Sequence, residues 1–463
     1  MYSYFLLAST LATAIAGPLV PRDDVTATVD LAVSRGAPQQ LASGFLYGIP
    51  DKEGQIPDHW YKDINFRWGR TGGAQMGAPN RGWTWGLSEY QGRLRSTLSN
   101  YRTMRKFGAE CIIYVHDLWG TDNGNSSSYW PGDGGNWAPY DNFLKRLMDD
   151  LVANNALEGL VWDIWNEPDI NVFWKRNTKQ WIDLYIRSHK AVRADARFNK
   201  VPISGPSLAW RPMASNTWWT SWLAAIAAAD AVPDQYSYHL EGDLRAVDND
   251  PQYTNASLAA LLRQYKLPDR QVSINEYAAF GEMVPSGYAW WISRLERFDW
   301  PGVLGNWQGG NTLHDLFANL LTKARNPRDY AAGDYAAAPG HHVYKYYAQN
   351  MTGTRARTAG STDMLFDVYA TRGNDRVRLL AGPKVATGKW SIQVRGLDAV
   401  GYPASGTVQV EAWEFQGSSA WAVTGPPVSK GSKTYTYSGG SVTIPVVQAN
   451  NYTAHALEFV VKH

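Results

Sequence analysis

Hydrophobic and polar positions alternate along the chain in two different ways. From about residue 44 to 325, short apolar runs of strand length are separated by longer segments with helical periodicity. This alternation is typical of a parallel sheet whose strands are joined by helical crossovers. Eight strands followed by helices predict an α/β fold, a closed (β/α)8 TIM barrel. The predicted strands are Phe45–Ile49, Ile64–Arg70, Glu110–His116, Leu160–Trp165, Lys200–Ser204, Gln235–His239, Gln271–Asn275 and Gly302–Trp307.

After about residue 350 the apolar positions follow a period of two, with turn residues between the runs. This pattern predicts a smaller C-terminal antiparallel β-sandwich over residues 350–463. Val25 to Val33 also alternate strictly, so we expect residues 25–38 to supply an N-terminal strand to the same sandwich. The barrel then occupies residues 39–349. The junction at Tyr344–Tyr347 is aromatic and helical in pattern, which favours a rigid structural domain over a flexibly linked binding module.

The N-terminus has the pattern of a signal peptide. Tyr4 to Ala16 is apolar, and at 13 residues it is too short to span a bilayer. We therefore expect a signal peptide over residues 1–16, a pro-segment over residues 17–24, and secretion to the extracellular space. Glycosylation sequons agree with export and should lie on the surface. They occur at Asn125, Asn255, Asn350 and Asn451.

Composition narrows the classes of function. The 463 residues carry a net charge of only +2, which gives no reason to expect a nucleic acid or a membrane as partner. Aromatic residues are abundant, with 22 Trp and 26 Tyr, and flat rings suit the apolar faces of sugars. More than half of the Trp residues should nevertheless belong to the core. The single cysteine, Cys111, lies in an apolar run and is expected to be a buried, inert thiol.

The fourth predicted strand ends in Trp165-Asn166-Glu167-Pro168. Pro168 stops the strand, which places Glu167 at the carboxyl end, where the active sites of barrel enzymes lie. The neighbouring Trp residues should desolvate the carboxyl group of Glu167, raise its pKa and keep it protonated as an acid. Asn166 offers a donor and an acceptor to a sugar hydroxyl. The alternative is a structural Glu167 paired with an arginine.

The seventh predicted strand also ends in a carboxylate, in Ile274-Asn275-Glu276. Strands four and seven face each other across a barrel mouth, so Glu167 and Glu276 can lie about 5 Å apart. That spacing is the geometry of a glycosidase that retains anomeric configuration. An inverting enzyme needs roughly 6.5–9.5 Å.

These strand-end motifs resemble those of clan A glycoside hydrolases, and most closely glycoside hydrolase family 39. The resemblance covers the barrel and its attached sandwich. It implies Glu167 as acid/base, Glu276 as nucleophile, and Asn166 as a ligand of the hydroxyl next to the anomeric carbon. Further substrate-site positions match the clan: Arg70, His239 and Trp307. The alternatives for these three are an ion pair, a core histidine and a core tryptophan.

The sequence also departs from the clan pattern. Clan members often carry a tyrosine two residues after the strand-six histidine, where it contacts the nucleophile; here that residue is Glu241. Tyr277 or another tyrosine takes that role, or Glu241 contacts substrate. His116 and Trp119 follow strand three and are either substrate contacts or structural. Of the loop tryptophans Trp119, Trp130, Trp137 and Trp210, at least two are expected to line a subsite.

Taken together, these residues predict a secreted retaining glycoside hydrolase that cleaves an oligo- or polysaccharide by double displacement. The two carboxyl groups need no cofactor. No metal is expected, because His341-His342 lacks a spaced acidic or cysteine partner. We expect a monomer whose partner is its carbohydrate substrate. The alternatives are a transglycosylase with the same residues and a non-catalytic carbohydrate-binding barrel.

Overall fold

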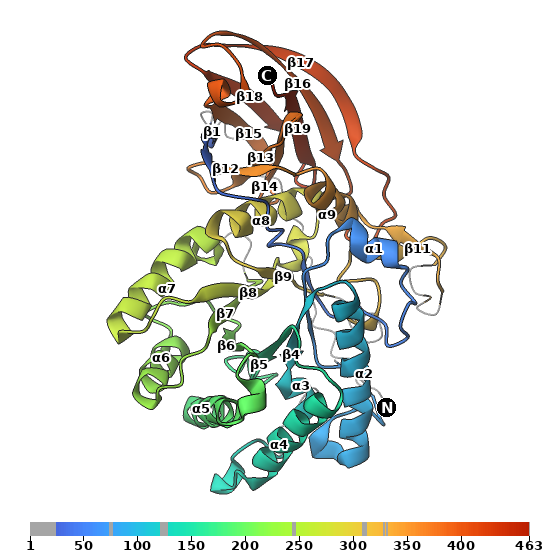
Figure 1. Ribbon diagram of the computed structural model, residues 1–463, viewed down its shortest axis with the longest axis vertical. Helices are drawn as coiled ribbons and strands as arrows, with labels where there is room; N and C mark the ends of the chain where they lie inside the picture. The colour runs from blue at the N-terminus through green and yellow to red at the C-terminus, as the bar shows by residue number, and fades with distance from the viewer. Residues whose placement is uncertain are drawn as a thin grey trace.

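The computed structural model describes residues 25–73, 77–120, 128–242, 247–307, 313–326, 329 and 332–462. Eight parallel strands close into a barrel in the order β2-β3-β4-β5-β6-β7-β8-β9, which confirms the predicted TIM barrel (Figure 1). The strands are β2 (Gly44–Leu46), β3 (Trp68–Thr71), β4 (Glu110–Tyr114), β5 (Leu160–Asp163), β6 (Ile203–Leu208), β7 (Gln235–Leu240), β8 (Gln271–Tyr277) and β9 (Gly302–Leu304). The predicted signal peptide, the pro-segment and Asn125 lie outside the described residues.

Helices surround the barrel, and several begin at residues that satisfy their first backbone N–H groups. The Asn177 side chain accepts from the N–H of Gln180 at the start of α5, and Asp250 precedes a proline at the start of α7. The helices are α1 (Asp58–Asp63), α2 (Leu87–Lys106), α3 (Val115–Trp119), α4 (Ala138–Ala153), α5 (Thr178–Ala194), α6 (Thr217–Ala229), α7 (Pro251–Tyr265), α8 (Pro285–Phe298) and α9 (Pro339–Gln349). The hairpin of β10 (Leu321–Lys323) and β11 (Tyr335–Ala337) lies between β9 and α9.

The second domain is one nine-stranded sheet folded over an apolar core, in the order β17-β16-β19-β14-β13-β12-β1-β15-β18. β1 (Val25–Ser34) lies between β12 and β15, which confirms the predicted N-terminal strand. Its pairing with β15 is parallel, so the sandwich is mixed rather than purely antiparallel. The other strands are β12 (Thr354–Ala359), β13 (Phe366–Arg372), β14 (Arg376–Pro383), β15 (Gly388–Arg395), β16 (Gly406–Phe415), β17 (Val428–Tyr437), β18 (Ser441–Gln448) and β19 (Ala454–Val460).

The sandwich sits on helix α8 of the barrel, against strands β13 and β14 (Figure 1). Buried ion pairs cross this boundary. Arg294 of α8 binds Asp367 of β13 at 2.6 Å and Asp250 at 2.8 Å, and Arg297 also binds Asp367. Such groups are stable in the interior only while both partners are present. The two domains therefore share a polar as well as an apolar boundary.

Three of the four sequon asparagines are in the described part of the chain, and Asn255, Asn350 and Asn451 are all exposed, as expected for surface positions. Cys111 is buried. None of the helices in the described segments combines the length and the apolar character needed to cross a bilayer.

Candidate active site

The carboxyl ends of β3, β4, β5, β7 and β8 bring one group of polar side chains together at the mouth of the barrel. The members are Arg70, Tyr114, Glu167, His239 and Glu276. They come from five different segments of the chain. Parallel strands in a closed barrel all end on the same face, which explains how residues more than 200 positions apart meet.

Glu276 is the penultimate residue of β8 and is buried. Its Oε1 accepts a hydrogen bond from the Tyr114 hydroxyl and another from Nη1 of Arg70 at 2.5 Å. Arg70 also donates to the Tyr114 hydroxyl, so the three groups form a closed set. A positive charge and a hydroxyl donor both favour the ionised carboxylate. Glu276 is thus held as an anion with a fixed orientation.

Arg70 is itself held by Asp163. Nε and Nη2 of Arg70 donate to Oδ2 of Asp163 at 3.0 and 2.6 Å, and both side chains are fully buried. Asp163 also accepts from the Ser207 hydroxyl and from Nδ2 of Asn275. Asp163 is therefore a buried, paired carboxylate. It fixes the guanidinium against Glu276.

Glu167 follows β5 by four residues and adopts a left-handed backbone conformation, with φ of 42°. Its N–H donates to the carbonyl of Ser207 at 2.9 Å. Non-glycine residues rarely adopt this conformation, and such positions cluster at functional sites. Burial raises the pKa of Glu167 to about 7, while the charge of Arg70 opposes that shift. Glu167 is thus a carboxyl group that keeps its proton up to neutral pH.

His239, in β7, links Glu167 to Arg70. Its Nδ1 lies 2.8 Å from Oε1 of Glu167, and its Nε2 lies 3.2 Å from Nη1 of Arg70. Burial lowers the pKa of His239 to about 4, so the ring is neutral near pH 7. An arginine can only donate, so Nε2 accepts and Nδ1 carries the proton. His239 then donates to Oε1 of Glu167, which leaves Oε2 to carry the acid proton.

The two carboxyl groups are close. Oxygens of Glu167 and Glu276 and a ring nitrogen of His239 all lie within 4.8 Å of one another. That spacing agrees with the roughly 5–5.5 Å of retaining glycosidases and not with the wider gap of inverting ones. The same atoms are close enough to share a cation. However, the guanidinium of Arg70 already contacts Glu276 and His239, and its charge opposes a second cation there.

A third carboxyl group, that of Glu241, completes the centre. It follows β7 and is in hydrogen-bonding contact with Glu276. Its pKa is raised well above the usual value by burial first and then by the charges of Glu276 and Glu167. Its Oε1 lies against Gly305 at the end of β9, where an added Cβ would come within 1.7 Å. A side chain at position 305 would therefore displace the Glu241 carboxyl group from this position.

Other predicted site residues lie at different depths. Asn166 is buried, and its Oδ1 has no hydrogen-bond partner in the described structure, so this oxygen can accept from a ligand. Trp307 is 42% exposed, and its Nε1 donates to the carbonyl of Ala278. His116 is buried. Its ring packs edge-on against Tyr114, and its Nε2 lies 3.1 Å from Asp117. This packing allows His116 to position Tyr114.

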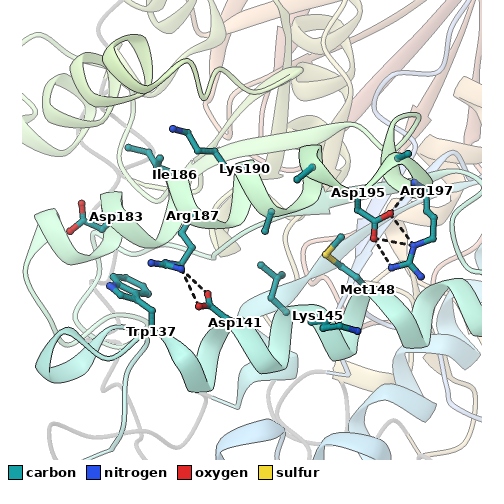
Figure 2. A pocket seen from close by; sticks show the side chains of 14 residues that line it. Trp137, Asp141, Lys145, Met148, Asp183, Ile186, Arg187, Lys190, Asp195 and Arg197 are labelled. Atoms are coloured by element: carbon teal, nitrogen blue, oxygen red, sulfur yellow. Dashed lines mark hydrogen bonds and ion pairs between the residues drawn. The ribbon is translucent and has the colours of Figure 1, made fainter.

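Trp119 does not fit the predicted role of substrate contact. The chain turns directly from β4 into α3, and this turn buries Trp119 against Tyr140 and Phe143 in the core. Trp130 is equally buried. Trp137 borders a groove of about 1030 Å³ between α4 and α5 on the outer helices (Figure 2). Of the four loop tryptophans, Trp210 is the well exposed one, and it follows β6 on the catalytic face.

Tyr277 is not the tyrosine that contacts the nucleophile. Its hydroxyl donates to the carbonyl of Ala42 and contacts the Tyr344 hydroxyl at 2.5 Å, inside the barrel wall. Tyr114 is the tyrosine that contacts Glu276, and it was not among the residues predicted from the sequence. The sequence nevertheless contained a signal for Tyr114. Residues two positions apart along a strand lie on the same face, and Ile112 and Tyr114 share the interior face of β4.

No family model matches the sequence, and no curated protein matches it. Among solved structures, N2152 from Neocallimastix frontalis is similar in fold, with a TM-score of 0.74 and 17% identity over 95% of this chain and 100% of that one. A glucosidase from Croceicoccus marinus follows at 0.62 and 13%, covering 96% and 100%. A GH39 β-xylosidase from Caulobacter crescentus gives 0.58 and 13%, covering 94% and 99%. The predicted resemblance to family 39 is confirmed at the level of the fold.

Proposed function

We propose that this protein is a secreted retaining glycoside hydrolase. The observation that carries the proposal is the pair formed by Glu167 and Glu276, with oxygens within 4.8 Å of each other in contrasting surroundings. Burial raises the pKa of Glu167 to about 7, whereas Arg70 and Tyr114 both bind Glu276. One proton donor beside one anion is what double displacement at a sugar requires.

In the first step Glu276 attacks the anomeric carbon, and the bond to the leaving oxygen breaks while Glu167 gives that oxygen its proton. The product is a glycosyl ester of Glu276. In the second step Glu167, now ionised, takes a proton from water, and the water oxygen attacks the same carbon. The ester bond breaks, Glu276 is released as a carboxylate, and Glu167 is protonated again.

Asn166 and Trp307 are placed to bind the sugar. The unpaired, buried Oδ1 of Asn166 can accept a hydrogen bond from the hydroxyl next to the anomeric carbon. Trp307 exposes a ring on which the sugar can stack. Arg70 is already bound to Glu276 and Asp163, and Glu241 adds a further carboxyl group. We therefore propose a neutral sugar at the cleavage site, because the guanidinium of Arg70 already pairs with Glu276 and Asp163 and is not available to bind the charged group of an acidic sugar.

Trapping of the covalent intermediate tests this function. Solved structures of this fold are named as glucosidases and β-xylosidases, so dinitrophenyl 2-deoxy-2-fluoro-glucosides and 2-fluoro-xylosides are the first reagents. We expect stoichiometric inactivation and a sugar ester on the peptide that contains Glu276. Glu276→Ala should not be labelled and should regain turnover with azide. Glu110→Ala, a glutamate at the opposite end of β4, is the control and should be labelled normally.

A label on a carboxylate other than Glu276 would show a different nucleophile. Turnover of aryl glycosides with inverted products and no trapped ester would exclude the retaining mechanism.

A further inference from the structure

Exposed aromatic side chains lie on three neighbouring segments near the mouth of the barrel. Trp307 follows β9 and is 42% exposed, Phe280 follows β8 and is 47% exposed, and Trp421 is 42% exposed. Trp421 belongs to the sandwich, in the loop between β16 and β17. Single exposed aromatics are common on protein surfaces, whereas several of them near a catalytic centre point to ligand binding.

The first two rings are connected to the centre by the end of β8. Nε1 of Trp307 donates to the carbonyl of Ala278 at 2.9 Å, and Ala278 is two residues after Glu276. Phe280 is two residues further on. Phe280 thus follows Glu276 by four residues, and four residues of fully extended chain span at most about 14 Å. Phe280 therefore lies within the distance of a few sugar units from the nucleophile.

The third ring comes from the other domain and is firmly held. The rings of Phe280 and Trp421 lie 5.2 Å apart between centroids, and Nε1 of Trp421 donates to Oδ1 of Asn319 at 2.9 Å. The same loop is tied to the hairpin, where the N–H of Thr424 donates to the carbonyl of Ala337 at 3.0 Å. Figure 1 shows this part of the sandwich reaching down toward β11.

We propose that Phe280 and Trp421 form a distal sugar-binding subsite, which continues from Trp307 and receives a chain extending out of the catalytic centre. This deepens the proposed glycosidase function by naming the substrate class as an oligosaccharide or polysaccharide of neutral sugars. The sandwich then contributes one wall of the substrate site. Rings that are held rigidly and half exposed lose little conformational entropy when a sugar stacks on them.

Binding measured by isothermal titration tests this subsite without needing turnover. The full-length protein carrying Glu276→Ala is titrated with xylobiose, cellobiose and laminaribiose and with the corresponding hexaoses. We expect Trp421→Ala and Phe280→Ala each to weaken hexaose binding roughly tenfold more than biose binding, a factor that corresponds to about 1.4 kcal/mol. Tyr253→Ala, which removes an aromatic ring of 42% exposure from α7, is the control and should leave both affinities unchanged.

A second variant separates stacking from support of the loop. Trp421→Phe keeps a ring but loses the hydrogen bond to Asn319, so it should retain most of the hexaose affinity. If Trp421→Phe binds as weakly as Trp421→Ala, the residue acts through Asn319 and the subsite is wrong. Equal losses for biose and hexaose, no loss, or no hexaose binding by the parent protein would also overturn it. Covalent trapping at Glu276 can still succeed in each of these cases, so the two proposals fail separately.

Discussion

The carboxyl group of Glu241 contacts that of Glu276, the proposed nucleophile. Two carboxylates cannot both be ionised at hydrogen-bonding distance without strong repulsion, so one of them must carry a proton. Glu276 has the partners of an anion, Arg70 and Tyr114. Glu241 has no such partner on its buried Oε1, and its pKa is raised well above the usual value by burial and by the two neighbouring glutamates. Glu241 is therefore the protonated member and donates to Glu276.

Glu241→Gln should keep most of the activity, because an amide can also donate to Glu276 and cannot ionise. Glu241→Ala removes a hydrogen bond to a charged group, worth about 1.5–3 kcal/mol, so we expect kcat/KM on an aryl glycoside to fall at least tenfold. The comparison is made with steady-state kinetics at pH 6. If the glutamine and alanine variants are equally impaired, the carboxyl group of Glu241 itself contacts substrate.

Tyr114→Phe should lower turnover by about ten- to a hundredfold, because it removes the hydroxyl that donates to Glu276. The protein should fold normally, since the ring stays in place against His116. The matched control is Tyr277→Phe. Its hydroxyl bonds to Ala42 and Tyr344 and not to Glu276, so it should reduce thermal stability and leave kcat unchanged. A loss of kcat in Tyr277→Phe with none in Tyr114→Phe would show that Tyr277 is the tyrosine that supports the nucleophile.

Glu167→Ala should affect substrates according to their leaving groups. A poor leaving group needs the proton of Glu167, so hydrolysis of an oligosaccharide should fall about 10²–10⁴-fold. A dinitrophenyl glycoside needs no protonation, and its glycosylation step should be almost unaffected. Pre-steady-state kinetics measures that step directly. A uniform loss for both substrates would assign Glu167 a structural role.

The pH dependence follows from the raised pKa of Glu167. Desolvation moves that pKa from 4.5 to about 7, so the group stays protonated across this interval and ionises above it. An acid catalyst acts in its protonated form. We therefore expect kcat/KM on oligosaccharides to decline above pH of about 7, by about tenfold per pH unit. Glu167→Ala should abolish this alkaline decline. A decline that begins near the unperturbed pKa would contradict the desolvated environment.

The sequence predicted the barrel well, because buried parallel strands have a strong local signature. The eight apolar runs each contain or overlap an observed strand. Strand β17 was not predicted. Nearly all of its residues are exposed, so it has no apolar alternation to detect. Strand β12, at Thr354–Ala359, is similarly short of apolar residues.

The candidate site was predicted in part, and the missing part depends on contacts between distant segments. Glu167 and Glu276 stand at strand ends and could be found from local motifs. The contact of Tyr114 with Glu276 depends on the register of non-adjacent strands, β4 and β8. Trp119 is not a substrate contact, because α3 follows β4 without an intervening loop and carries Trp119 into the core. No local pattern in the sequence indicated that a helix begins directly after this strand.

The last prediction concerns the boundary between the two domains. Asp367 lies at the centre of this boundary, fully buried, and accepts from Arg294 at 2.6 Å and from Arg297. Asp367→Ala leaves the buried guanidinium groups of Arg294 and Arg297 without this partner. We expect the free energy of unfolding to fall by about 3–5 kcal/mol. Because Arg294 belongs to α8 and Asp367 to β13, we expect both domains to lose stability together, in one calorimetric transition. Asp375→Ala, which removes an exposed partner of Arg378 in the same sandwich, is the control and should cost at most about 1 kcal/mol. Two separate transitions, with only the sandwich destabilised by Asp367→Ala, would show that the domains fold independently and that the sandwich is not the rigid support of the barrel.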